Sequence, residues 1–253
     1  MTLDLFRLDG RVAIVTGAST GLGQGMSLAL AEAGADVVGV DYVDMPETET
    51  LISALGRGFL GIKANLMSTE PIQGILEATV ARFGRIDILV NNAGIIRRED
   101  ALNFTEKDWD DVMDINVKTV FFLSQAVARQ YIRQGGGGKI INIASMLSFQ
   151  GGIRVPSYTA SKSGVMGITR LMANEWAKYG INANAIAPGY MATNNTAPIR
   201  ADEQRSADIL ARIPAGRWGT PGDVKGPVVF LASAASDYVN GYTLAVDGGW
   251  LAR

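Results

Sequence analysis

Three polar side chains in the second half of the chain have the types and spacing of an acid–base site: Ser145, Tyr158 and Lys162. Tyr158 and Lys162 are four residues apart in a stretch with helical spacing of apolar residues, so their side chains share one face of the predicted helix. Pro156 is typical of the first turn of such a helix. Ser145 follows the apolar run 139–144, which predicts a strand, and open α/β sheets bind ligands at the carboxyl ends of their strands.

The chemistry that suits this trio is hydride transfer to or from a carbon that carries a hydroxyl group. A phenol has a pKa near 10, which is too high for a base at neutral pH. An ammonium group about 4 Å away is worth about 4 kcal/mol at an effective dielectric constant of roughly 20, which lowers the pKa by up to about 3 units. We therefore expect Tyr158 to titrate near neutrality and to exchange the hydroxyl proton of the substrate. Ser145 would hold the same substrate oxygen by a hydrogen bond.

The composition excludes several other kinds of site. The 253 residues include no Cys and no His, which excludes thiolate nucleophiles, disulfides, Ser-His-Asp hydrolysis and most transition-metal sites. The 23 basic and 25 acidic residues are balanced, so no basic surface for nucleic acid is predicted. No apolar run reaches roughly 18 residues, and charges within residues 1–11 argue against a signal peptide. We expect one cytoplasmic domain over residues 1–253, with no metal, nucleic-acid or membrane partner.

A glycine-rich turn near the start of the chain predicts the cofactor site that the Tyr-x-x-x-Lys motif requires. The apolar run 11–16 predicts a buried parallel strand, the turn follows from Gly17 to Gly23, and a helical stretch continues to Glu32. Glycines let the backbone approach a pyrophosphate, and the helix N-terminus supplies amide donors. No Lys-Ser or Lys-Thr pair follows the glycines, which excludes a P-loop. A tight turn required only by packing is the alternative.

Asp41 ends the next predicted strand, Val37 to Val40, at about the separation expected for an acid that binds the adenosine ribose hydroxyls of a dinucleotide. Its carboxylate would repel a 2′-phosphate, and no basic residue lies in the turn or directly after Asp41. The sequence therefore predicts NAD rather than NADP. An aspartate that serves only the turn at the end of the strand is the alternative.

The rest of the chain alternates between strand and helix patterns. Strands are expected at 60–64, 86–90, 181–187 and 242–246, and helices at 72–83, 202–212 and 224–232, while residues 105–133 form one long helix or two. The polar, interrupted residues 190–214 resemble a mobile substrate lid. We predict a single-domain α/β fold: a Rossmann-type, doubly wound parallel sheet with helices on both faces.

Seven features in this order and spacing resemble the short-chain dehydrogenase/reductase family over nearly the whole chain. They are Thr16-Gly17-x-x-x-Gly21-x-Gly23, Asn91-Asn92-Ala93-Gly94, Asn116, Ser145, Tyr158-x-x-x-Lys162, Pro188-Gly189-x-x-x-Thr193 and Asp247-Gly248-Gly249. The resemblance implies that Tyr158 is the general acid/base, Ser145 orients the substrate, Lys162 binds the nicotinamide ribose and lowers the tyrosine pKa, and Asn116 holds a water in the proton relay. The implied cofactor-binding residues are Gly17, Ser19, Gly21, Leu22, Gly23, Asp41, Asn65, Leu66, Asn92, Ala93, Gly94, Tyr158, Lys162, Pro188, Gly189 and Thr193. Many members carry Asp where this chain has Asn65.

Further stretches at 96–102, 145–156, 189–196 and 250–253 resemble members of the family that interconvert a hydroxyl and a ketone on six-carbon deoxy-keto sugar acids. Arg154, four residues before Tyr158, would suit a bidentate contact with the carboxylate of such a substrate. The alternative for Arg154 is an ion pair at the surface or at a subunit interface. The candidate substrate-binding residues are Ser145, Gln150, Arg154, Tyr158 and Tyr190.

Other interpretations of the sequence stay open. Arg97 and Arg98 are expected on a solvated loop, with a position facing the cleft as the alternative. A different short-chain reductase, acting on 3-oxoacyl thioesters or polyols, would have an apolar or extended channel and often uses NADP. A non-catalytic dinucleotide-binding scaffold would have a broken catalytic set, whereas the set is complete here. The family is commonly tetrameric, so a homotetramer is expected, with helices 105–133 and 157–178 at one interface.

Overall fold

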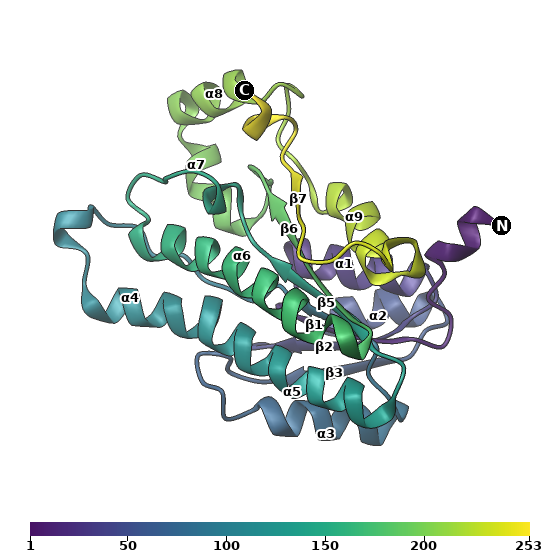
Figure 1. Ribbon diagram of the computed structural model, residues 1–253. Helices are drawn as coiled ribbons and strands as arrows, with labels where there is room; N and C mark the ends of the chain where they lie inside the picture. Colours follow the sequence, from purple (N-terminus) through teal and green to yellow (C-terminus); the bar gives the residue numbers. More distant parts are fainter.

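The computed structural model describes all 253 residues, and its centre is one sheet of seven parallel strands (Figure 1). Across the sheet the strands follow the order β3-β2-β1-β4-β5-β6-β7. Their bounds are β1 Val12–Thr16, β2 Asp36–Asp41, β3 Phe59–Lys63, β4 Ile88–Asn91, β5 Gly138–Ile143, β6 Ile181–Pro188 and β7 Thr243–Val246. The strand order reverses between β1 and β4, and such a switch point is where open α/β sheets bind ligands.

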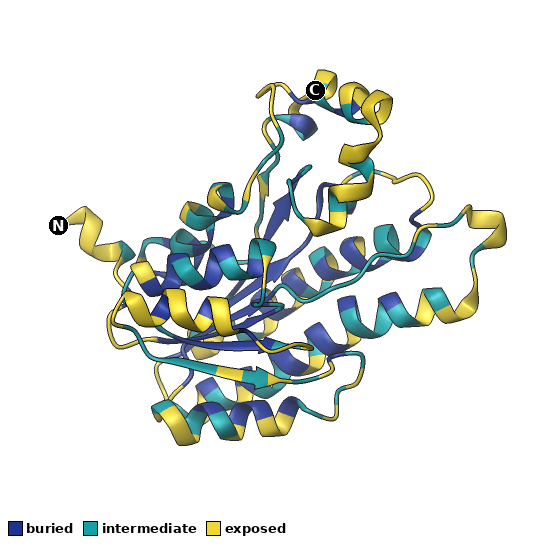
Figure 2. Ribbon diagram, turned by 180° about the vertical axis from the view of Figure 1, so that it is seen from behind, coloured by how far each residue is buried: buried dark blue, intermediate teal, exposed yellow.

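Helices cover both faces of the sheet, whose strands form a largely buried layer between them (Figure 2). One face is covered by α1 Gly21–Glu32, α2 Pro46–Ala54 and α9 Lys225–Ala232, and the other by α3 Ile72–Phe83, α5 Thr119–Gln134 and α6 Pro156–Trp176. β1 is buried along its whole length, because its apolar side chains meet helices on both sides. This confirms the predicted single-domain, doubly wound α/β fold.

Most predicted elements are present, with ends shifted by one or two residues. α3 occupies the predicted residues 72–83, whereas β4 begins at Ile88 rather than at Ile86. Residues 105–133 form two helices, α4 Glu106–Met113 and α5, joined by a π-helical turn at Asp114–Lys118. The sequence did not reveal α2, because only two of its side chains are buried and no apolar stripe marks it.

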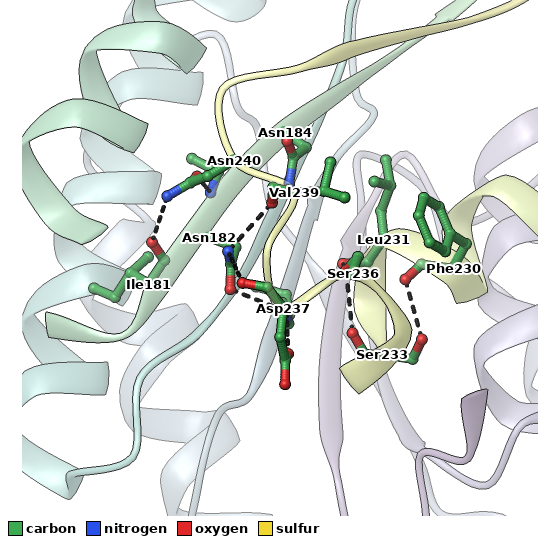
Figure 3. Close-up of polar contacts among 12 residues, drawn as sticks. Ile181, Asn182, Asn184, Phe230, Leu231, Ser233, Ser236, Asp237, Val239 and Asn240 are labelled. Atoms are coloured by element: carbon green, nitrogen blue, oxygen red, sulfur yellow. Dashed lines mark hydrogen bonds and ion pairs between the residues drawn. The ribbon is translucent and has the colours of Figure 1, made fainter. Parts of the chain in front are cut away.

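Asparagine side chains hold the loop between α9 and β7 against the start of β6 (Figure 3). Asn182 and Asn184 both donate to the Val239 carbonyl, at 3.2 and 2.8 Å. Asn240 accepts from the Ala183 amide at 2.8 Å and donates to the Ile181 carbonyl at 3.4 Å. These bonds pair backbone groups at the sheet edge and guide the chain into β7, parallel to β6.

Residues 190–214 contain two short helices, α7 Ala197–Ala201 and α8 Glu203–Arg212, and the C-terminal turn lies beside α8 (Figure 1). Trp250 is buried there, its ring 4.9 Å from that of Tyr190, and the Arg212 guanidinium lies 4.0 Å from the Trp250 ring. The Arg253 guanidinium donates to the Ala211 carbonyl at 3.3 Å. None of the helices combines the length and the apolar character needed to cross a membrane.

Candidate active site

A cavity of about 660 Å³ lies at the carboxyl ends of the strands. It is lined by Gly17 after β1, Asp41 at the end of β2, Asn92 after β4, Ser145 after β5 and Gly189 after β6. All the predicted cofactor-binding residues lie in its wall, namely Gly17, Ser19, Gly21, Leu22, Gly23, Asp41, Asn65, Leu66, Asn92, Ala93, Gly94, Tyr158, Lys162, Pro188, Gly189 and Thr193. The parallel strands bring these sequence-distant residues to one edge of the sheet.

The glycine-rich turn is packed so closely at Gly17 and Gly23 that a side chain would not fit at either position. A Cβ on Gly23 would lie 1.9 Å from the Gly17 carbonyl oxygen, and a Cβ on Gly17, whose φ is +67°, would lie 2.7 Å from Asn92. The Asn92 amide group donates to the Thr16 and Gly17 carbonyls at 2.9 and 3.1 Å. The turn after β4 thus braces the turn after β1, and Asn92 supports the cavity wall through the backbone of its neighbour.

The first turn of α1 faces this cavity with its backbone amides free of a side-chain cap. The N-cap residue Thr20 makes no capping hydrogen bond, and Gly21 and Leu22 line the cavity beside it. Uncapped amides and the positive end of the helix dipole favour an anion such as a pyrophosphate. This arrangement fits the dinucleotide that the turn predicts.

Asp41, at the end of β2, lies in the cavity wall. Its carboxylate accepts hydrogen bonds from the Ser19 amide at 2.9 Å and from the Tyr42 amide at 2.7 Å. Two backbone donors hold the side chain in the cavity wall, and the carboxylate oxygens retain further acceptor sites for hydroxyl groups. Neither Ser19 nor Tyr42 carries a positive charge that would offset repulsion of a 2′-phosphate.

Three of the four predicted catalytic side chains line another part of the same cavity. Ser145 accepts a hydrogen bond from the Leu147 amide at 3.1 Å, which holds its hydroxyl in the turn after β5. Tyr158 and Lys162 come from successive turns of α6, and all three side chains line the cavity. The Lys162 ammonium donates to the Ile143 carbonyl at 2.7 Å, so it is anchored to the end of β5.

Burial dominates the titration of both groups in α6. It lowers the pKa of Lys162 to about 8. It also raises the pKa of Tyr158 above 10.0, although a hydrogen bond from Ser145 and the positive charge of Arg98 oppose this rise. The Lys162 ammonium lies 5.6 Å from the centroid of the Tyr158 ring. The prediction that Lys162 brings the phenol close to neutrality is therefore wrong for the protein chain by itself, because burial keeps the pKa of Tyr158 raised and the groups that oppose the rise are Ser145 and Arg98.

Asn116 lies behind the cavity wall rather than in it. It is fully buried in the π-helical turn between α4 and α5, a local widening of the helix that is frequent at functional sites. Its amide group donates to the Ile95 carbonyl and to the Ser161 hydroxyl, both at 3.0 Å, and accepts from the Ile95 amide at 2.9 Å. In this structure Asn116 joins the loop after β4 to α6.

Three predicted substrate-binding residues do not line the cavity. Arg154 forms ion pairs with Glu99 and Asp100, at 3.5 and 3.4 Å. Tyr190 packs edge-on against Trp218 and Trp250. The third, Gln150, lies in the loop before α6. Of the five candidates, Ser145 and Tyr158 face the cavity.

The cavity wall also contains residues outside the predicted catalytic, cofactor and substrate sets, among them Arg97, for which a position facing the cleft was the alternative. They are Thr20, Tyr42, Ala64, Met67, Ile95, Arg97, Ile115, Ile143, Ala144, Met191, Asn194, Asn195 and Thr196. Most are sequence neighbours of predicted residues, so proximity to the motifs was the available signal. The apolar ones among them, such as Ile95, Ile115 and Ile143, carry no chemical signature that distinguishes them from core residues.

Comparison with known proteins gives consistent matches over the whole chain. Residues 17–251 match the family model described as enoyl-(acyl carrier protein) reductase. The chain is 71% identical to 2-dehydro-3-deoxy-D-gluconate 5-dehydrogenase of Escherichia coli (strain K12) and 68% identical to that of Dickeya dadantii (strain 3937), each over 100% of both chains. It also resembles the crystal structure of a candidate 2-deoxy-d-gluconate 3-dehydrogenase from Agrobacterium tumefaciens with bound NADP, at 54% identity and a TM-score of 0.93, covering 98% of this chain and 99% of that one.

Proposed function

Because the chain belongs to the short-chain dehydrogenase/reductase family and is an oxidoreductase, we propose that it oxidises and reduces a deoxy-keto sugar acid with NAD. The substrate class is that of 2-dehydro-3-deoxy-D-gluconate, after which the relatives at 71% and 68% identity are named. The reaction interconverts a secondary alcohol and a ketone. The observation that carries the proposal is that Ser145, Tyr158 and Lys162 share one cavity with the glycine-rich turn and Asp41.

Each part of the cavity wall has a role in this proposal. The amides at the start of α1 would hold the pyrophosphate, Asp41 the adenosine ribose and Lys162 the nicotinamide ribose. Asn65 and Leu66 would contact the adenine, and Thr193 the nicotinamide half. The nicotinamide supplies or accepts the hydride when it is bound.

The chain's own groups move the proton and orient the substrate. Tyr158 would give a proton to the substrate oxygen in reduction and take it back in oxidation. Ser145 would donate a hydrogen bond to the same oxygen and stabilise the charge that develops there. Lys162, anchored to the end of β5, would hold its charge beside the ring throughout.

Steady-state kinetics with both cofactors test the proposal directly. We expect kcat/KM with NAD to exceed that with NADP by about 10- to 100-fold, since Asp41 repels a 2′-phosphate and solvent screens this repulsion only in part. A preference for NADP, the cofactor bound in the Agrobacterium relative, would overturn this choice of cofactor while leaving the reaction type intact.

A second candidate is a reductase of 3-oxoacyl thioesters, because the chain is also 40% identical to a 3-oxoacyl-(acyl-carrier-protein) reductase of Vibrio cholerae. The same assay separates the two when it compares 2-dehydro-3-deoxy-D-gluconate with a 3-oxoacyl thioester and a polyol. Turnover of the sugar acid alone supports the proposal, and turnover of the thioester or the polyol alone rejects it. The proposal also includes the cytoplasmic location expected from the sequence and a homotetramer, which the family resemblance implies.

A further inference from the structure

Three arginines lie in the loops near the mouth of the cavity, and they differ in what neutralises them. Arg97 lines the cavity, but its guanidinium pairs with Asp108 at 3.3 Å and with Asp111 at 3.5 Å. Both carboxylates come from α4. The positive charge of Arg97 is therefore already compensated, and it serves to fasten the loop after β4 to that helix.

Arg154 is neutralised in the same way. Its guanidinium pairs with Glu99 and Asp100, and its carbonyl accepts a hydrogen bond from the Glu99 amide at 3.1 Å. Its backbone has a φ of +61°, a left-handed conformation that is costly for a side chain with a Cβ. The contacts on both sides of Glu99 join the loop after β4 to the loop before α6. Arg154 thus holds Glu99 and Asp100, the two residues directly after Arg98.

Arg98 differs from both neighbours because its guanidinium pairs with no carboxylate. It donates one hydrogen bond, to the Asn195 carbonyl at 3.0 Å. Asn195 lines the cavity and belongs to the segment 190–214. The charge of Arg98 also lowers the pKa of Tyr158, so the guanidinium lies within electrostatic range of the proposed acid/base. Arg98 itself is exposed and does not line the cavity, so its uncompensated guanidinium lies at the rim, where it holds the cavity-lining segment at Asn195.

We propose that Arg98 binds the carboxylate of the sugar-acid substrate and thereby selects anionic substrates. This inference rests on the proposed function and replaces Arg154 by Arg98 as the carboxylate ligand. Arginine suits the role, because its fork of donors matches a carboxylate in a bidentate contact. The hydrogen bond to Asn195 uses one of five N–H donors, so the others remain available.

The dimensions of the substrate set how far its carboxylate lies from the reacting carbon. In 2-dehydro-3-deoxy-D-gluconate the carboxylate carbon is C1, and the reacting carbon named for the relatives is C5. Four carbon–carbon bonds of about 1.5 Å each separate them, which spans about 5 Å in an extended chain. When C5 reaches the phenol, the carboxylate therefore lies close to Tyr158 but not on it. A cation near Tyr158 that is not hydrogen-bonded to it is the group that could bind this carboxylate.

The test compares two substrates, 2-dehydro-3-deoxy-D-gluconate and its uncharged C1 amide. Arg98→Gln should raise KM for the acid by about 10- to 100-fold, the loss expected when a charged hydrogen-bonded partner is removed. KM for the amide should stay within about twofold, because no ion pair is lost. Arg98→Lys, which keeps the charge but not the fork, should give an intermediate KM for the acid.

Arg253→Gln is the matched control, since Arg253 is also exposed, also lacks a carboxylate partner and also donates to a backbone carbonyl, at Ala211. It should change neither KM. Equal losses on both substrates, or no loss, in Arg98→Gln would overturn the inference. A higher KM for the acid alone in Arg154→Gln, together with an unchanged KM in Arg98→Gln, would also overturn it. A wild type that turns over no sugar acid would instead reject the proposed function, and the inference with it.

Discussion

Opposing effects act on the pKa of the Tyr158 phenol. Burial raises its pKa, whereas the Ser145 hydrogen bond and the Arg98 charge lower it. Desolvation disfavours the charged form of any group, so a phenolate here depends on charges that remain close. Lys162 is itself affected, because burial lowers its pKa to about 8. The acid–base function at the residue scale is thus a property of the whole polar cluster.

Replacement of Tyr158 by Phe tests the assigned acid/base. The substitution removes one hydroxyl group and keeps the ring, so we expect kcat to fall by about 100- to 10,000-fold while the affinity for NAD stays within about twofold. Stopped-flow or steady-state assays measure the first quantity, and fluorescence titration with NAD measures the second. Full turnover in the Phe variant would exclude Tyr158 as the acid/base.

The pKa of Lys162 predicts a pH dependence of stability. Its pKa is about 8 in the folded protein against 10.5 for an ordinary lysine. The unfolded chain therefore binds the proton more tightly, and the free energy of unfolding rises with pH between about 8 and 10.5. From pH 7 to pH 9.5 the wild type should gain about 2 kcal/mol relative to Lys162→Met.

Urea titrations of both proteins at the two pH values measure this difference. Tyrosines that titrate near the upper limit are present in both proteins, so their contribution cancels in the comparison. A difference between wild type and variant that is the same at both pH values would contradict the lowered pKa of Lys162.

At the scale of elements, the π-helical turn connects the loop after β4 to α6, and both of these contribute residues to the cavity wall. It carries Asn116, which bonds to the backbone of Ile95 on one side and to Ser161 of α6 on the other. A regular α-helical path at this point would shift the side chains that follow by one position around the helix axis. The turn therefore places one amide where three hydrogen bonds can form at once.

Asn116→Ala should lower the free energy of unfolding by about 1–3 kcal/mol, because it leaves buried partners without hydrogen bonds. Thermal or urea unfolding measures the loss. Asp114→Asn is the control in the same turn: it removes an exposed ion pair with Lys118, which is worth less than about 1 kcal/mol. Equal stability of the two variants would show that Asn116 is not a structural joint.

At the scale of the whole molecule, exposed apolar side chains on one face bear on the proposed homotetramer. Phe122 of α5 and Leu171 of α6 are each 42% exposed. Phe122→Glu should place an uncompensated charge in that interface and reduce the assembled mass, as measured by light scattering. Leu55→Glu, at the end of α2 on the opposite side of the sheet, should leave the mass unchanged. An unaltered mass for Phe122→Glu would place the interface elsewhere.

Much of the fold and of the candidate site follows from the sequence by itself, because the signals involved are local. A buried parallel strand is marked by an apolar run, and the glycines of the segment 17–23 mark a tight turn. Tyr158 and Lys162 share a face because they are one helical turn apart. Residues one turn apart in α6 are adjacent regardless of how the rest of the chain folds. These local rules predicted the sheet, the glycine-rich turn and the Tyr158–Lys162 pair, whereas most of the other predicted residues of the cavity wall were implied by the family resemblance.

The tertiary structure alone decided which charges are free and which are compensated. Arg97, Arg98 and Arg154 look alike in the sequence, yet Asp108 and Asp111 neutralise the first, and Glu99 and Asp100 the last. The pKa of Tyr158 likewise depends on burial and on Arg98, which is 60 residues away along the chain. Electrostatic energies depend on distance in space and on the surrounding dielectric, and neither quantity is encoded in the separation of residues along the sequence.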